Sequence, residues 1–178
     1  MHVEYRLIKA EELTLDLFCG FDRTQFVTRC WRKQDGQWVL RDIAFEEKWG
    51  TEQYQFLIRC LKNTLQCGGV CWGAFAPDGR LVGFASVERA PFGDQKQYVQ
   101  LSSLHVSRES RRHGIGRQLF EQAAHSAREW GSAKLYISAH SALETQAFYH
   151  AIGCVEAEAY DQKLASAEPC DCQMEFVL

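Results

Sequence analysis

Several features that mark other classes of protein are scarce in this sequence of 178 residues. Proline occurs only three times, and no apolar run approaches the roughly eighteen residues that a membrane-spanning helix needs. The first residues, MHVEYRLIKAEE, lack the apolar stretch of a signal peptide. We therefore expect a cytoplasmic protein that does not associate with membranes.

The sequence also lacks an excess of charge of one sign. Twenty Lys and Arg residues stand against 23 Asp and Glu residues, which gives a formal net charge of −3 at pH 7. Proteins that bind nucleic acid usually present a strongly basic surface. The charge balance therefore gives no reason to expect a nucleic acid as partner.

Cysteine is plentiful, but its spacing completes no familiar metal site. Three residues separate Cys67 from Cys71, and one residue separates Cys170 from Cys172. The common zinc sites need a second C-x-x-C pair or a pair of histidines. Disulfide frameworks are typical of short secreted chains, which this chain does not resemble. We expect no bound metal and interpret the eight cysteines as buried apolar residues or free thiols.

What the sequence does contain is an alternation of extended and helical patterns, which we interpret as one domain over residues 1–178. The expected strands are 3–8, 38–40, 70–76, 81–88, 97–106, 135–137, 154–160 and 172–178, the last with a half-buried alternation. The expected helices are 11–32, 51–65, 115–130 and 143–152. This order predicts an α/β protein with a single mixed, mostly antiparallel sheet flanked by helices.

The most informative segment runs from Leu101 to Gly116 and reads LSSLHVSRESRRHGIG. A strand pattern passes into a loop with glycine at positions 114 and 116, and then into an amphipathic helix. The first amides of a helix lack partners and carry partial positive charge, and glycine lets a phosphate approach them closely. Cationic and imidazole side chains crowd the loop: Arg108, Arg111, Arg112, His113 and Arg117. The segment therefore predicts a site for a phosphorylated ligand.

Two common nucleotide-binding motifs, G-x-x-x-x-G-K-[ST] and G-x-G-x-x-G with a downstream acidic residue, are absent. Instead, residues 111–116 (RRHGIG) resemble the [Q/R]-x-x-G-x-[G/A] pyrophosphate loop of the GCN5-related N-acetyltransferase (GNAT) family, which binds acetyl-coenzyme A (acetyl-CoA). Residues 144–154 (ETQAFYHAIGC) resemble the second motif of that family, a helix carrying F-Y-x-x-x-G. The two motifs follow one another in the family order, so that the resemblance covers residues 101–154.

This resemblance implies an acyl-CoA N-acyltransferase fold with acetyl-CoA as the acyl donor. Backbone amides around Leu104 and Val106 are then expected near the thioester. Before the second helix the family often has an Asn, where this chain has Ser141-Ala142-Leu143-Glu144. The residues expected to bind the cofactor are Leu104, His105, Val106, Arg111, Arg112, His113, Gly114, Ile115, Gly116, Arg117, Ser141 and Phe148.

The resemblance also assigns a general acid, because the catalytic tyrosine of the family matches Tyr149. A phenol with a pKa of about 10 is protonated at neutral pH and can protonate a leaving thiolate. The general base is open between Glu88, at the end of a strand, His140, which follows a strand, and His105, which has the opposite strand phase to Leu104. A chain of water molecules can replace a dedicated base. We expect Tyr149, Glu88 and His140 to be the catalytic residues.

The predicted function is transfer of an acetyl group to a primary amine, by direct attack in a ternary complex. We expect the acceptor to be a small molecule and the protein to be a monomer or homodimer. Two alternatives stay open: a non-catalytic acyl-CoA sensor or adaptor, and an acetyltransferase that acts on a protein amino group. Aromatic residues of the N-terminal half either line an apolar acceptor pocket or pack in the core: Trp31, Trp38, Phe45 and Trp49.

Overall fold

The computed structural model describes residues 2–178. Its strands are β1 (Glu4–Leu7), β2 (Gln25–Gln34), β3 (Gln37–Glu47), β4 (Val70–Phe75), β5 (Leu81–Val87), β6 (Tyr98–Val106), β7 (Lys134–Ala139), β8 (Val155–Glu156) and β9 (Cys172–Val177). Its α-helices are α1 (Thr51–Gln66), α2 (Ile115–Glu129), α3 (Leu143–Ala151) and α4 (Gln162–Ala167). Short 3₁₀ turns are η1 (Ala10–Glu12), η2 (Leu15–Phe18) and η3 (Arg108–Ser110). None of the helices in this described part is long and apolar enough to cross a membrane.

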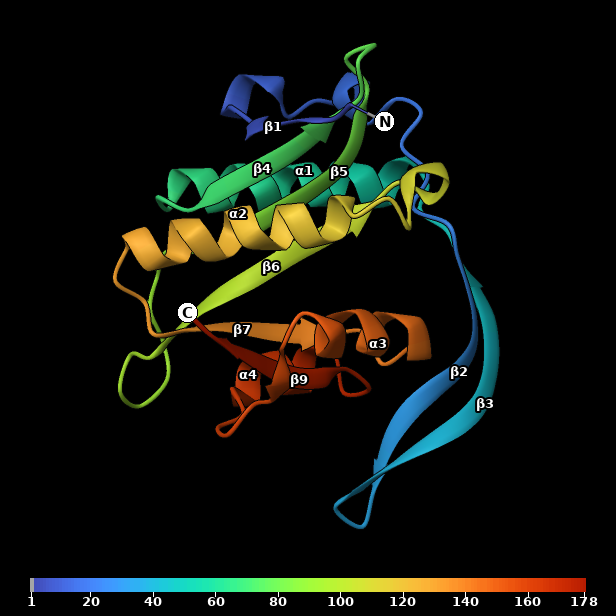
Figure 1. Cartoon of the computed structure of the whole chain (residues 1–178), viewed down its shortest axis with the longest axis vertical. Helices are drawn as coiled ribbons and strands as arrows, with labels where there is room; N and C mark the ends of the chain where they lie inside the picture. Colours follow the sequence, from blue (N-terminus) through green and yellow to red (C-terminus); the bar gives the residue numbers. More distant parts are fainter. Residues whose placement is uncertain (1) are drawn as a thin grey trace.

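Most strands form one twisted sheet with the order β1-β4-β5-β6-β7-β9-β8 (Figure 1). Neighbouring strands in it are antiparallel, except that β6 and β7 are parallel. Strands β2 and β3 form a separate hairpin, which extends away from the sheet (Figure 1). The predicted mixed and mostly antiparallel sheet is therefore confirmed.

Helices α1 and α2 cover opposite faces of β4 and β5 (Figure 1), because these strands carry apolar side chains on both faces. Phe84 packs among the apolar residues between the sheet and α1, and Ala85 packs among those between the sheet and α2, because successive side chains of a strand point to opposite faces. The apolar stripe of α2 is at most 2% exposed at Ile115, Leu119, Phe120, Ala123, Ala124 and Ala127. The helix lies so close that a Cβ atom on Gly83 would come within 2.8 Å of Leu119 Cδ1.

The opening that forms the functional site begins where β6 and β7 separate. Their pairing covers only residues 98–100 against residues 134–136, after which the two strands diverge. On its other edge β6 stays paired to β5 as far as Val106, with a register shift opposite Ser86 and Val87. A bulge of this kind bends a strand, and here it lies at the point of separation.

The expected helix over residues 11–32 is wrong. The structure has η1 and η2 there, followed by β2, which pairs with β3 along its whole length. The short expected strand at residues 38–40 is part of β3. The hairpin turns at Asp35 and Gly36, whose φ angles of 50° and 79° suit a two-residue turn. Because the hairpin buries few side chains, among them Val27 and Cys30, its sequence shows no clear alternation.

The C-terminal part also differs from the prediction in detail. The expected strand at 154–160 shrinks to β8, and α4 follows, with Asp161 Oδ1 accepting a hydrogen bond from Leu164 N at 2.9 Å. Strand β9 is buried on both faces from Cys172 to Glu175, rather than half-buried. Its polar residues are satisfied inside the sheet, since Gln173 accepts a hydrogen bond from Tyr136 at 2.7 Å.

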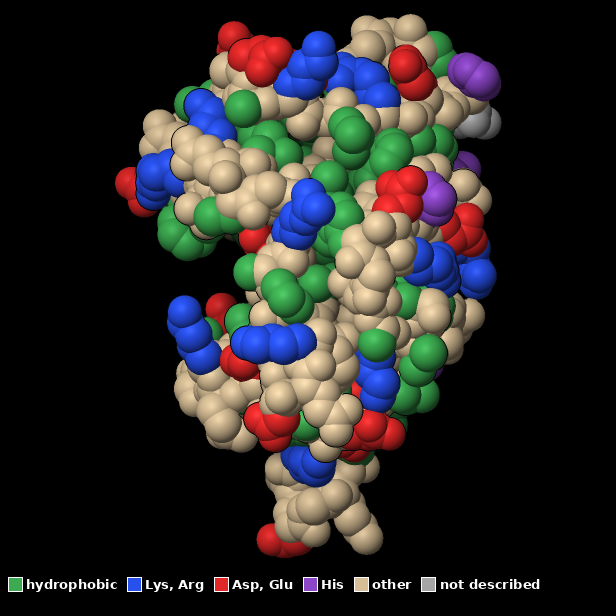
Figure 2. Space-filling view, turned by 90° about the vertical axis from the view of Figure 1, so that its left-hand side faces the viewer, with side chains coloured by type: hydrophobic (Ala, Val, Ile, Leu, Met, Phe, Trp, Pro, Cys, Tyr) green, Lys and Arg blue, Asp and Glu red, His purple; other side chains and the backbone are tan. Residues whose placement is uncertain are grey.

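The cysteines and the surface charges agree with the sequence analysis. All eight cysteines are free thiols, and Cys30, Cys71, Cys154 and Cys172 are buried. On the face shown in Figure 2, Lys and Arg side chains are mixed with Asp and Glu side chains. No group of three or more His, Cys, Asp or Glu residues within 2–178 is arranged to hold a metal ion.

Candidate active site

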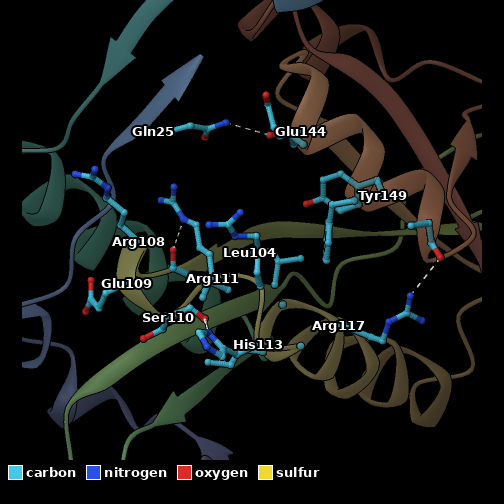
Figure 3. A pocket seen from close by; sticks show the side chains of 18 of the residues that line it. Gln25, Leu104, Arg108, Glu109, Ser110, Arg111, His113, Arg117, Glu144 and Tyr149 are labelled. Atoms are coloured by element: carbon cyan, nitrogen blue, oxygen red, sulfur yellow. Dashed lines mark hydrogen bonds between the residues drawn. The ribbon is translucent and has the colours of Figure 1, made fainter. Parts of the chain in front are cut away.

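Two cavities meet where β6 and β7 separate. The first cavity, of about 1080 Å³, lies between β6, the loop from η3 to α2, and α3 (Figure 3). The second cavity, of about 460 Å³, lies between β6, β7, the C-terminal end of β3, and α4. Within the described residues, six line both cavities: Gln25, Leu104, Val106, Arg111, Thr145 and Tyr149. These six residues mark the junction at which two bound molecules would touch.

The loop before α2 opens its backbone to the first cavity. Gly114 caps the helix with a φ angle of 80°, in the left-handed region that favours glycine, and Arg112 has a φ angle of 63°. A Cβ atom on Gly114 would meet nothing within 4 Å, whereas one on Gly116 would lie 3.2 Å from Phe148 Cε2. The backbone at the start of α2 is therefore open at Gly114 and packs closely against Phe148 at Gly116.

Positive charge dominates the wall of the first cavity. The cationic and imidazole side chains there are Arg108, Arg111, Arg112, His113 and Arg117, against the carboxylates of Glu109 and Glu144. Two of the arginines are held in place: Arg111 Nε donates to Val106 O at 3.0 Å, and Arg117 Nη2 donates to Ala151 O at 3.3 Å (Figure 3). Burial lowers the pKa of Arg111, and the neighbouring cation of Arg23 lowers it further. An anion of high charge density, such as a diphosphate, fits this wall.

The backbone of β6 offers unused hydrogen-bonding groups at the junction. Ser107 N donates to Val82 O on the β5 side at 2.9 Å, whereas Val106 O accepts from Arg111 on the opposite side. Because backbone groups alternate along a strand, the amides of Leu104 and Val106 point into the opening between β6 and β7. These amides can stabilise negative charge on an oxygen atom placed there.

Tyr149 enters the junction from α3. Its side chain is 6% exposed and lines both cavities, and in Figure 3 its hydroxyl group points into the first cavity. Within residues 2–178 this hydroxyl group has no hydrogen-bond partner, unlike the hydroxyl groups of Tyr98 and Tyr136. Burial raises the pKa of Tyr149, and the nearby Cys154 and Asp171 raise it further. The phenol therefore stays protonated at neutral pH, where it can donate a proton.

Both histidines named from the sequence line the second cavity, and each uses Nδ1 as an acceptor. His105 Nδ1 accepts from Arg23 Nε at 2.9 Å, and His140 Nδ1 accepts from Ala142 N at 3.1 Å. Burial lowers the pKa of His105 well below its ordinary value, and the cations of Arg23 and Arg111 act in the same direction. In the neutral form each ring carries its proton on Nε2, so that it donates rather than accepts there.

Two other predicted site residues lie outside both cavities. Glu88 is half-buried and accepts hydrogen bonds from Thr64 at 2.6 Å and from Ser102 at 2.8 Å. Since Ser102 lines the second cavity, Glu88 reaches that cavity only through this hydroxyl group. Ser141 is 2% exposed, and its Oγ accepts from Arg32 Nη1 at 2.6 Å, which ties the hairpin to the start of α3. The structure thus does not bring Glu88 or Ser141 together with Tyr149.

The sequence analysis missed several residues of the second cavity. Arg23, placed in an expected helix, instead forms an ion pair with Glu47 on β3, with 3.2 Å between Nη2 and Oε2. Glu168 and Asp171 enter from the segment between α4 and β9. No motif could have signalled these residues, because they come from distant parts of the chain. Among the aromatic candidates, Trp49 does line this cavity.

Comparisons with known proteins place this geometry in context. The model of the acetyltransferase (GNAT) family matches residues 27–154. The structure is similar to that of nourseothricin acetyltransferase, with 18% identity, 99% of each chain covered and a TM-score of 0.71. It is also similar to a Bacillus anthracis str. Ames protein in complex with acetyl coenzyme A, assigned as a streptothricin acetyltransferase, with 15% identity, 100% of this chain and 97% of the other covered, and a TM-score of 0.72.

A third similar structure is PaiA N-acetyltransferase from Thermoplasma acidophilum in complex with coenzyme A, with 18% identity, 100% of each chain covered and a TM-score of 0.60. At such low identities the likeness shows a shared fold. No curated protein matches the chain.

Proposed function

Because this chain belongs to the GNAT acetyltransferase family, we propose that it moves the acetyl group of acetyl-CoA to a primary amine of a small molecule, by direct attack in a ternary complex. As a member of that family it is an N-acetyltransferase with acetyl-CoA as the acyl donor. The observation that carries the proposal is the junction of the two cavities at Tyr149 and the open β6 backbone. A donor in the first cavity and an acceptor in the second would meet at this point.

The first cavity fits the donor. The loop amides before α2 and the arginines around them suit the diphosphate of coenzyme A, and Gly114 leaves space for its approach. The opening along β6 then accommodates the extended arm, with the thioester near Leu104 and Val106.

The chemistry follows from the groups at the junction. The amides of Leu104 and Val106 polarise the thioester carbonyl, an interaction that typically contributes a few kcal/mol. The amine nitrogen forms a bond to the carbonyl carbon, and the bond from that carbon to sulfur breaks. Tyr149 donates its proton to the departing sulfur and regains one from the attacking nitrogen. The products are an N-acetyl amine and the free thiol of coenzyme A.

The size of the second cavity supports a small-molecule acceptor. Its volume of about 460 Å³ falls within the range of about 300–1,000 Å³ that is usual for small-molecule sites. The structural neighbour named nourseothricin acetyltransferase acts, by its name, on a small molecule. Of the bases predicted from the sequence, His140 lines this cavity, whereas Glu88 acts on an amine there only through Ser102 or water.

A thiol-release assay tests the proposal. Purified protein is mixed with acetyl-CoA and a panel of small primary amines, and a lysine-containing peptide is tested in parallel. We expect thiol release with at least one small amine and a product heavier by one acetyl group in mass spectrometry. Release with the peptide alone would favour the protein acceptor. Binding of acetyl-CoA without release for any amine would favour the non-catalytic sensor.

Substitution of the general acid tests the mechanism. Tyr149→Phe should lower kcat by about 10- to 100-fold, because the departing thiolate loses its proton donor. The affinity for acetyl-CoA in calorimetry should stay unchanged. Tyr5→Phe is the matched control, since Tyr5 is half-buried on β1 and lines neither cavity. A wild-type kcat for Tyr149→Phe would remove the assigned role.

A further inference from the structure

An amine acceptor reaches the enzyme mostly as an ammonium ion, so that acetyl transfer needs a group that takes its proton. The titratable groups that line the second cavity are Arg23, Glu47, His105, Arg111, His140, Tyr149, Glu168 and Asp171. The inference rests on the proposed function and asks which of these groups can accept the proton.

Hydrogen bonding excludes most of them. Arginine stays protonated, and Tyr149 is the proposed acid. The two histidines have their acceptor nitrogen occupied, by Arg23 in the case of His105 and by the Ala142 amide in the case of His140. Glu47 Oε2 lies 3.2 Å from Arg23 Nη2, so that the charge of this carboxylate is already matched by an arginine. Glu168 and Asp171 remain, and of these Glu168 is exposed, whereas Asp171 is half-buried.

Asp171 is held in place by a chain of hydrogen bonds inside the sheet. Asp161 N donates to Tyr136 OH at 3.0 Å, which in turn donates to Gln173 Oε1 at 2.7 Å. Gln173 Nε2 donates to Ser138 Oγ at 2.9 Å, and Ser138 Oγ donates to Asp171 Oδ2 at 3.2 Å. Tyr136 and Gln173 are at most 2% exposed, so the middle of this series of hydrogen bonds is shielded from solvent, whereas Ser138 and Asp171 are half-buried. Every hydrogen bond donates in the direction of Asp171, which lines the second cavity, and none of them uses Asp171 Oδ1.

The electrostatic surroundings favour proton uptake. Burial raises the pKa of Asp171, and although Ser138 and His140 lower it, the carboxylates of Glu168 and Glu47 raise it again. Titratable groups from every neighbouring element face it: Glu47 from β3, His140 after β7, Tyr149 from α3, Glu168 after α4, and Cys172 from β9. A carboxylate with a raised pKa exchanges protons with an amine more readily than an exposed one.

We infer that Asp171 is the general base of the second cavity and that Ser138 is the residue that positions it. The acceptor ammonium gives one proton to Asp171 Oδ1, which passes it to solvent. The neutral amine then forms its bond to the carbonyl carbon. The nitrogen then gives a second proton to the Tyr149 oxygen, where it replaces the proton that Tyr149 gives to sulfur. One proton is released per acetyl group transferred, so that charge and atoms balance.

The test compares Asp171→Asn with the wild type over a range of pH, at saturating acetyl-CoA and with the best amine of the panel. We expect kcat near pH 7 to fall about 100-fold. The rate of the variant should recover as the pH rises towards the pKa of the amine, because free amine then arrives without a base. A merely structural role would not produce this recovery. Ser138→Ala should cause a smaller fall in kcat, of about fivefold, and should shift the acid side of the pH profile to higher pH, because the Ser138 hydrogen bond lowers the pKa of Asp171.

Matched variants separate the role of Asp171 from a general effect of charge. Asp42→Asn removes an exposed carboxylate on β3 outside both cavities and should keep kcat within about twofold of the wild type. Glu168→Gln removes the exposed carboxylate that lines the second cavity beside Asp171, and it should lower kcat less than Asp171→Asn does.

Each outcome decides the assignment. Circular dichroism verifies folding, and if Asp171→Asn does not fold, Ser138→Ala carries the test. The inference is overturned if Asp171→Asn, or Ser138→Ala in its place, has the kcat and pH profile of the wild type, or if Glu168→Gln shows the larger loss. If the wild-type protein acetylates no amine, the proposed function itself is overturned. This result needs no variant and is therefore distinguishable from a failure of the assignment of Asp171.

Discussion

The two cavities of this enzyme are built in different ways. The first draws most of its wall from residues 104–117 and from α3, which are continuous stretches of chain. The second is assembled from β3, β6, β7, α3 and the segment around α4, together with residues before β2. Five cationic or imidazole side chains and two carboxylates line the first cavity, whereas two arginines, two histidines and three carboxylates line the second. Under the proposed function, a compact local motif would bind the donor, and dispersed residues would select the acceptor.

The largest effect is expected from Gly114→Val, which should damage the first cavity alone. Gly114 has a φ angle of 80°, which a β-branched residue rarely adopts, so the loop must shift and its amides must turn. We expect the affinity for acetyl-CoA, measured by calorimetry, to fall at least about 100-fold, or about 2.7 kcal/mol.

Gly79→Val is the matched control, because Gly79 has a φ angle of 84° and equally open surroundings in the turn between β4 and β5. Gly79→Val should lower the free energy of unfolding about as much as Gly114→Val does, and it should leave acetyl-CoA binding intact. Tight binding by Gly114→Val would contradict the assignment of the loop.

A smaller effect, confined to the second cavity, is expected from Arg23→Ala. Arg23 is 8% exposed, pairs with Glu47 and donates to His105, and it lines the second cavity but not the first. Without it, Glu47 and His105 lose their partner, and we expect KM for the amine to rise about tenfold, which corresponds to about 1.4 kcal/mol. The affinity for acetyl-CoA should stay within about twofold of the wild type.

Arg29→Ala on the exposed side of β2 serves as the control. A tenfold loss of acetyl-CoA affinity in Arg23→Ala, with KM for the amine unchanged, would show that the two cavities are not independent in this way.

The smallest effect concerns the sheet beneath the second cavity and depends on pH. Burial raises the pKa of Glu175, but hydrogen bonds from Lys134, Tyr98 and the Glu158 amide together lower it by more, so that the net shift is downward. The stabilisation is therefore fully present above the unfolded-state pKa of about 4.3 and is lost as the pH falls through the lower folded-state value. Urea unfolding of the wild type should show this loss.

Glu175→Gln should cost about 1 kcal/mol of unfolding free energy at neutral pH and show less loss of stability on acidification. Glu46→Gln, an exposed carboxylate on β3, should behave as the wild type does. If Glu175→Gln lost stability on acidification as steeply as the wild type, another carboxylate would be responsible for the loss of unfolding free energy at low pH.

The first cavity could be predicted from sequence because its signals are local. Residues 101–130 contain, one after another, a strand, the arginines, two glycines and a helix. The F-Y motif likewise lies within one short helix, α3. Ser141 is the exception, since its side chain is occupied by Arg32 from β2. Most of β2, which supplies this arginine, lies in the segment predicted to be a helix, because the hairpin buries too few side chains to show a period of two.

The sequence by itself determined the order of elements in the sheet core, the buried face of α2 and the cation-rich loop that lines the first cavity. Each of these depends on residues within one or two turns or strands of each other. Only the tertiary structure decided that Arg23, Glu47 and Asp171 share a cavity, and that Glu88 does not belong to it. Such neighbours are set by how β6 and β7 diverge and by where the hairpin and α4 pack, which depends on contacts across the whole chain.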